Sequence, residues 1–237
     1  MSKASKYMLT LGKKTTIVPR NFNIHMGHTV LERVKSIKYL GVIFDEKFKW
    51  KEHVSYLSSK LACSVGVLSK LRYYTNIPTL IKVYHSLICS HLNYGLIVWG
   101  AAGTTALKPV RVLQNRAIRF ISRAPRRHKL DIAYLNLRIL KLNDLHSLAK
   151  HKFMHQYHHN KLPDYFSDFF AKTPIQHPNF RRNPLANLMA MDCKKKFTER
   201  SIRYTGPTIW GKVPLLKREL SPSKFRKEFT NHFLAQY

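Results

Sequence analysis

The chain has 237 residues, with 42 Lys and Arg against 12 Asp and Glu and a formal net charge of +30. Its hydrophobic fraction of 44% and aromatic fraction of 12% are ordinary for a folding protein and exclude a disordered basic tail. The positive charge is spread along the chain and indicates a polyanionic partner. Nucleic acid is favoured over an anionic membrane surface or an acidic protein.

Cysteine usage and hydropathy bear on the compartment in which the chain is expected. Cys63, Cys89 and Cys193 are odd in number and lie far apart, so neither a disulfide framework nor a zinc knuckle is expected. Lys82 and other polar residues interrupt the most apolar window, 80–99, which predicts a buried helix and no membrane partner. We find no secretory signal and expect an intracellular protein, nuclear or cytoplasmic.

The first fifth of the chain is predicted to form strands and turns. The alternating segment 22–26 precedes Gly27 and His28, a plausible two-residue turn, and a return strand follows. Segment 37–44 is β-branched and aromatic and is predicted to be the clearest strand of the chain.

Helical spacing of apolar residues begins at residue 50. A first helix has one apolar face, formed by Trp50, Val54, Leu57, Leu61, Val65 and Leu68. The next helix, from about 80 to 98 with Pro78 at its first turn, is apolar nearly all round and is predicted to be central.

A third helix is predicted after Gly103. Thr104 or Thr105 is expected to cap it, and Pro125 to stop it. Its predicted apolar stripe consists of Ala106, Val110, Leu113, Ala117 and Phe120. Two further helices are predicted near 130–136 and 142–160.

Prolines and basic runs mark the last third of the chain, for which we expect a looser region with two short helices, near 199–210 and 222–235. The fold class expected is mainly α with a small N-terminal β-hairpin or meander (α+β). The expected divisions are a β segment at 1–49, a helical bundle at 50–160 and an irregular basic region at 161–237.

The strongest candidate site is a run of basic residues without an acidic residue among them. It comprises Arg111, Arg116, Arg119, Arg123, Arg126, Arg127 and Lys129. On a helix, Arg116, Arg119 and Arg123 share the face opposite the apolar stripe. A solvated surface is the alternative, but such a surface usually carries both signs of charge. We therefore predict phosphate contacts for Arg116, Arg119, Arg123, Arg126 and Arg127.

Other candidate chemistry is weaker. Aromatic residues near cations, such as Tyr73 and Tyr74 beside Arg72, are typical of stacking platforms, although helix cores show the same pattern. His151, His155 and His158 or His159 share a helical face, but no nearby carboxylate or Cys completes a metal site and several lysines oppose one. We predict a solvated, partly basic face there and no bound metal.

Neither hydrolytic nor phosphoryl-transfer motifs occur. A two-metal site needs converging carboxylates, and the 12 acidic residues are scattered. The only adjacent pair, Asp45 and Glu46, is at a predicted turn. We therefore expect no catalytic residues and no cofactor in this chain.

Several segments form an ordered series along nearly the whole chain. They are 34–45 running into 48–54, 68–72, 84–88, 92–95 with 98–100, 113–119, 162–163, 206–210, 213–214 and 225–227. In this order they resemble the C-terminal part of reverse transcriptases from jockey-type non-LTR retrotransposons. No single segment is diagnostic, and the order carries the resemblance.

The resemblance implies roles for two parts of the chain. Tyr39, Leu40 and Gly41 would belong to the primer-grip hairpin that follows the palm, and the helices after them would form the thumb, which holds a primer–template duplex. The family's catalytic aspartates lie upstream of the residue matching Met1, as do the fingers and most of the palm. The chain is thus expected to be a fragment of an RNA-directed DNA polymerase that is inactive alone, with Mg²⁺ required only by an intact polymerase.

The expected partners are nucleic acid (RNA, DNA or hybrid, bound without sequence specificity) and the missing palm and fingers region of the parent polymerase. The alternative is a basic RNA-binding scaffold or assembly protein without enzymatic ancestry. Extended basic tails would favour that alternative, whereas here the basic residues lie mainly among periodic apolar ones.

Overall fold

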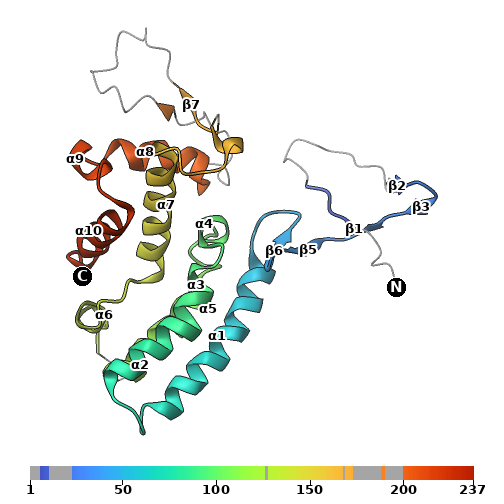
Figure 1. Ribbon diagram of the computed structural model, residues 1–237. Coiled ribbons are helices and arrows are strands. Elements are labelled where there is room, and N and C mark those ends of the chain that lie inside the picture. The colour runs from blue at the N-terminus through green and yellow to red at the C-terminus, as the bar shows by residue number, and fades with distance from the viewer. Residues whose placement is uncertain (1–5, 11–22, 126–127, 168, 173–187, 190–199) are drawn as a thin grey trace.

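The computed structural model describes residues 6–10, 23–125, 128–167, 169–172, 188–189 and 200–237. Helices dominate these residues, and the strands are short and pair only in twos (Figure 1). The predicted fold class, mainly α with a small β part, is confirmed. Within the described ranges, no helix has both the length and the apolar character required to cross a bilayer.

The strands of the described residues form four two-stranded sheets. The pairs are β1 (Lys6–Tyr7) with β4 (Glu32–Arg33), β2 (His25–Met26) with β3 (Thr29–Val30), β5 (Ser36–Tyr39) with β6 (Val42–Asp45), and β7 (Ala171–Lys172) with β8 (Leu188–Met189). Only the first pair is parallel. The hairpin predicted around Gly27 is confirmed as β2–β3, which is solvent exposed and belongs to an arm extending away from the helices (Figure 1).

The single strand predicted over 37–44 is wrong, because this segment is the β5–β6 hairpin. Leu40 and Gly41 form its two-residue turn with φ angles of 45° and 80°, and Tyr39 pairs with Val42. Such a turn has positive φ at both central positions. Leucine rarely adopts this conformation, so the residue types in segment 37–44 do not predict that the chain reverses there.

Helix α1 (Lys51–Leu71) follows a turn that the side chain of Asp45 stabilises. The Asp45 carboxylate accepts hydrogen bonds from the backbone N–H groups of Lys49 and Trp50, at 2.9 and 2.6 Å. This carboxylate holds the chain that leaves β6 at the start of the helix. The predicted apolar face is confirmed as buried, with Leu61 fully enclosed.

The second predicted helix is interrupted, which corrects the expectation of one helix buried nearly all round. Its parts are α2 (Ile77–Tyr84), a π-helical turn η1 (His85–Cys89), α3 (Ser90–Asn93) and α4 (Leu96–Trp99). Gly95, with φ of 60°, separates α3 from α4. One face is buried, whereas Leu87 and Val98 are 39% and 40% exposed.

Helix α5 (Lys108–Ser122) packs along α1, and its N-cap is Leu107 without a side-chain cap. The expected cap at Thr104 or Thr105 is therefore wrong, because the helix begins beyond both residues. Helices α6 (Asp131–Asn136) and α7 (Leu142–His158) lie where they were predicted.

The C-terminal segments are less loose than expected. They comprise a 3₁₀ turn η2 (Asp164–Phe166) and the helices α8 (Ile202–Gly211), α9 (Leu215–Arg218) and α10 (Pro222–Leu234). Helices α8 and α10 confirm the two predicted ones, and α9 was not predicted. Trp210 and Phe225 are buried with residues of α7 in a second hydrophobic core. Helix α7 contributes residues to this core as well. The division of the chain at residue 160 stays a prediction.

Candidate nucleic-acid interface

The predicted arginine face lies on α5, opposite its buried side. The buried residues of this helix are Val110, Gln114, Ala117, Ile118 and Ile121. Leu113 and Phe120 of the predicted stripe are only half-buried and line a small groove between α5 and α1. Arg116 is exposed, Arg119 is half-buried, and Arg123 directly follows the helix with φ of 55°. Arg126 and Arg127 lie outside the described residues.

Arg72, at the end of α1, joins this arginine group through tertiary packing. Two guanidinium groups lie over the Phe120 ring, with Arg72 at 4.8 Å and Arg116 at 5.6 Å from the ring centre. Arg123 donates a hydrogen bond to the carbonyl oxygen of Arg72 at 3.3 Å. Cation–π contacts thus hold the guanidinium groups in place without neutralising their charge.

Carboxylates are absent from this arginine group in the described residues. The described residues form five ion pairs in total, and none of these involves Arg72, Arg116, Arg119 or Arg123. The Nε atoms of Arg72 and Arg119 are buried without a hydrogen-bond partner in the described structure. The group is therefore a concentrated positive charge, and phosphate oxygens are the acceptors that suit such guanidinium groups.

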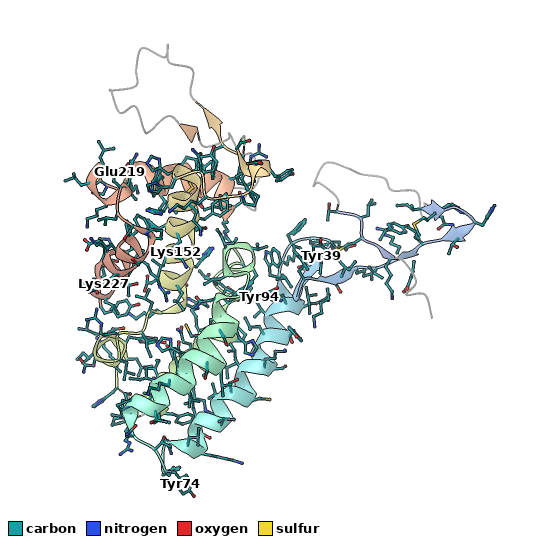
Figure 2. All side chains as sticks on the ribbon, viewed as in Figure 1. Tyr39, Tyr74, Tyr94, Lys152, Glu219 and Lys227 are labelled. Carbon is teal, nitrogen blue, oxygen red and sulfur yellow. The ribbon has the colours of Figure 1, made fainter. Side chains whose placement is uncertain are left out.

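The predicted primer-grip-like residues are the last residue of β5 and the two turn residues of the β5–β6 hairpin, which packs on the interruption between α3 and α4. The Tyr94 hydroxyl donates a hydrogen bond to the carbonyl oxygen of Leu40 at 2.6 Å. A Cβ on Gly41 would lie 3.1 Å from the Tyr94 ring, and one on Gly95 would lie 3.0 Å from Val42. Figure 2 shows Tyr39 and Tyr94 near each other at this end of the helices.

The side chains at the hairpin turn are free to contact a ligand. Tyr39 is 62% exposed, Leu40 72% and Tyr94 57%. Nearby, Lys38 donates to the Tyr56 hydroxyl at 3.2 Å. The hydrogen bonds from Lys60 and Lys38 lower the pKa of Tyr56. This Lys–Tyr–Lys group was not predicted, because a β-strand and a helix face must meet to form it.

The structure does not gather the predicted site residues into one cluster. The hairpin turn lies near the start of α1, whereas Arg72 and Arg123 lie at its end. The 21 residues of α1 extend over roughly 30 Å. That length corresponds to roughly nine base steps of a nucleic-acid strand. The two predicted groups are therefore separate surfaces along one helix pair.

The histidine face of α7 is packed, which corrects the prediction of a solvated face. His155 is buried and its Nε2 lies 2.8 Å from the carbonyl oxygen of Leu220, while His151 stacks on Phe229 at 4.5 Å between ring centres. Among the described residues, His158, His159 and Glu219 form a group close enough to share a cation. The Nε2 atom of His159 already contacts a backbone carbonyl oxygen at 2.8 Å.

The curated proteins to which this chain is similar are RNA-directed DNA polymerases of mobile elements. The chain is 26% identical over 149 residues to the RNA-directed DNA polymerase from mobile element jockey of Drosophila melanogaster, covering 62% of this chain and 16% of the relative. It is 28% identical over 124 residues to the jockey polymerase of Drosophila funebris, covering 51% and 14%. A probable RNA-directed DNA polymerase from transposon X-element of Drosophila melanogaster is 24% identical, covering 51% and 13%.

No family model matches this chain, and no solved structure matches it. The match spans about a sixth, or less, of the length of these curated relatives. Over about half of its own length, the chain is thus homologous, at low identity, to RNA-directed DNA polymerases of jockey and other non-LTR retrotransposons.

Proposed function

We propose that this chain is the primer-grip and thumb part of a non-LTR retrotransposon reverse transcriptase, and that it binds nucleic-acid backbones without sequence specificity. The observation that carries the proposal is the arginine group of Arg72, Arg116, Arg119 and Arg123, which has no carboxylate partner among the residues that the structure describes. The similarity to polymerases, whose substrates are nucleic acids, supports the same function.

Backbone binding fits the chemistry of this surface better than base reading does. Guanidinium groups bind phosphate oxygens in a forked geometry, and such contacts carry no sequence information. The exposed rings of Tyr73 and Tyr74 lie at the same end of α1, where a base could stack on them. RNA, DNA and hybrid duplexes all present the phosphates that this surface requires.

We expect the isolated chain not to catalyse nucleotidyl transfer. Nucleotidyl transfer requires carboxylates that converge on metal ions. Asp45 caps the turn before α1, Asp144 accepts a hydrogen bond from Tyr237, and Glu228 pairs with Lys217. These carboxylates have structural partners and lie on separate elements. We expect no primer extension on a primed RNA template with Mg²⁺ and dNTPs, and extension by the purified chain would contradict this expectation.

A charge-matched pair of variants tests the binding surface. The triple variant Arg116→Gln, Arg119→Gln, Arg123→Gln removes three charges from α5. The control Lys212→Gln, Lys224→Gln, Lys227→Gln removes three exposed charges from the C-terminal helices. Fluorescence anisotropy with a labelled RNA–DNA hybrid should show at least a tenfold weaker Kd for the arginine variant than for the control.

Two results would contradict the proposal. Equal weakening in both variants would mean that net charge alone determines binding, without an interface on α5. A Kd that differs more than tenfold between hybrids of unrelated sequence would mean that bases are read. Circular dichroism of both variants verifies that the helices are intact.

A further inference from the structure

A second cationic site lies where the helical bundle meets the C-terminal helices. A cavity of about 280 Å³ opens between α2–η1–α3, the connection from α6 to α7, α7 itself and α10. Arg138, Lys152 and Arg226 line it, each from a different one of these elements. Figure 2 shows Lys152 on α7, on the side of the molecule away from the hairpin.

The cations of this cavity have no carboxylate among the residues that line it. Arg226 lies close enough to His85, Cys89 and Lys152 for its charge to act on all three. After burial, which is the larger cause, the charge of Arg226 lowers the pKa of Lys152 and of His85. Arg226 and Lys152 therefore repel each other, and Arg138 adds a third exposed positive charge to the lining, so an anion in the cavity would relieve the repulsion.

The rim of the cavity is held in place by hydrogen bonds. Arg138 has a φ of 52°, and its Nη2 donates to the side-chain oxygen of Asn231 at 2.7 Å. This bond ties the α6–α7 connection to α10. Asn93 donates to the sulfur of Cys89 at 3.2 Å. Of the three cations, Arg138 is thus positioned before any ligand arrives, which reduces the ordering cost of binding at that residue.

The floor of the cavity is apolar. It is formed by Ile139, Leu140, Leu145 and Leu148, with Tyr84 beside them. A ligand that suits both parts must have an apolar or planar body and a strongly anionic end. A phosphate monoester carries about two negative charges at neutral pH and offers three acceptor oxygens to Arg and Lys donors.

We propose that this cavity binds the phosphate monoester of a nucleotide, with the phosphate at Arg138, Lys152 and Arg226 and the base on the apolar floor. The phosphate belongs either to a free nucleotide or to the terminal nucleotide of a strand. The site is separate from the arginine group on α5 and goes beyond backbone binding there. Because residues of both hydrophobic cores line the cavity, a bound nucleotide would link the helical bundle to the C-terminal helices.

Cys89 gives a local readout, because it lines the cavity and is half-buried, whereas Cys63 is exposed on α1. Burial raises the pKa of the Cys89 thiol. A bound phosphate would shield this thiol and disfavour its thiolate, so both effects slow alkylation. The full chain is treated with N-ethylmaleimide at pH 8 with increasing AMP, and mass spectrometry of peptides reads Cys89 and Cys63 separately.

The expected result is saturable protection of Cys89 by AMP, at least fivefold, with an unchanged rate at Cys63. Adenosine and KCl at matched ionic strength should not protect. The variant Lys152→Gln, Arg226→Gln should require at least tenfold more AMP, whereas the control Lys224→Gln, Lys227→Gln, which removes two charges from α10 outside the cavity, should behave as the wild type.

A second set of alkylation experiments, with 12-nucleotide strands in place of AMP, distinguishes a free nucleotide from a strand terminus as the ligand. Stronger protection by a 5′-phosphorylated strand than by AMP assigns the site to a strand terminus, and weaker protection assigns it to a free nucleotide. No protection of Cys89 in the wild type, or equal protection by adenosine, would overturn the proposal. The wild-type result alone decides this, whether or not the double variant folds.

Discussion

Individual residues hold the β5–β6 hairpin against the helices. Tyr94 and Leu40 are 54 positions apart in the sequence, and one hydrogen bond between them places the turn on the α3–α4 interruption. Gly41 permits this approach because it has no β-carbon to meet the Tyr94 ring. Its φ of 80° is also a conformation that other residues adopt only with strain.

Two glycine substitutions should therefore have opposite effects. Gly41→Ala is expected to lower the free energy of unfolding by about 1–2 kcal/mol, because backbone strain and the contact with Tyr94 act together. Gly66 lies inside α1, and a Cβ there meets nothing within 4 Å. Gly66→Ala should raise the free energy of unfolding by about 0.5–1 kcal/mol. Urea denaturation measures both, and a Gly41→Ala variant as stable as the wild type would refute the turn geometry.

Buried histidines predict a pH dependence of stability. Burial, with a contribution from Lys150, lowers the pKa of His146 to about 4. The unfolded histidine titrates near pH 6.5, so between pH 6.5 and 4 the unfolded state binds more protons and the free energy of unfolding falls as the pH falls. His146 should contribute a loss of about 3 kcal/mol across this window. Burial also lowers the pKa of His53 and His155, which adds to the decline.

Replacing one histidine isolates its share of that decline. The variant His146→Leu cannot titrate at this position, so its free energy of unfolding should fall less steeply than that of the wild type below pH 6.5. Urea denaturation at pH 7.5, 6.5, 5.5 and 4.5 provides the comparison. Parallel curves for the two proteins would show that the imidazole is not buried in its neutral form.

At the scale of elements, sequence periodicity predicted where helices occur but not where they break. The apolar face of α1 and the positions of α6, α7, α8 and α10 follow from spacing and from Pro and Ser at helix starts. The turn at Leu40 and the π-helical turn at His85–Cys89 do not, because tertiary contacts override local preference there. The meeting of Arg72 with Arg123 likewise depends on how two helices pack.

Gln114 ties three of these elements together in the buried region. Its amide nitrogen donates to the Tyr84 hydroxyl at 3.0 Å and to the carbonyl oxygen of Leu140 at 2.9 Å. Its amide oxygen accepts from the backbone nitrogen of Leu142 at 2.9 Å. Helices α2, α5 and the start of α7 therefore depend on one side chain, a role that sequence spacing could not reveal.

Removing this amide should be costly. Gln114→Leu leaves buried polar groups without partners and is expected to lower the free energy of unfolding by about 3 kcal/mol or more. Gln156 lies exposed on α7, so Gln156→Leu serves as the matched control and should change stability by less than about 0.5 kcal/mol. Thermal and urea denaturation would contradict the three-way link if the two variants were equally stable.

In the molecule as a whole, part of the charge of +30 gathers on two distinct surfaces of the described residues. One is the arginine group along α1 and α5, and another is the cavity of Arg138, Lys152 and Arg226. Composition predicted a polyanionic partner, and the sequence placed α5 correctly. The second surface could not be predicted, because its cations come from segments brought together only by the packing of α10 on α7.

The salt dependence of hybrid binding shows whether the arginines of α5 contact phosphates. If about six phosphates are contacted, the logarithm of the binding constant should fall with the logarithm of salt concentration at a slope near −5. The variant Arg116→Gln, Arg119→Gln, Arg123→Gln should reduce this slope by about 3. Its lysine control on the C-terminal helices should retain the wild-type slope. Identical slopes and affinities for the wild type and the arginine variant would mean that α5 is not part of a nucleic-acid interface.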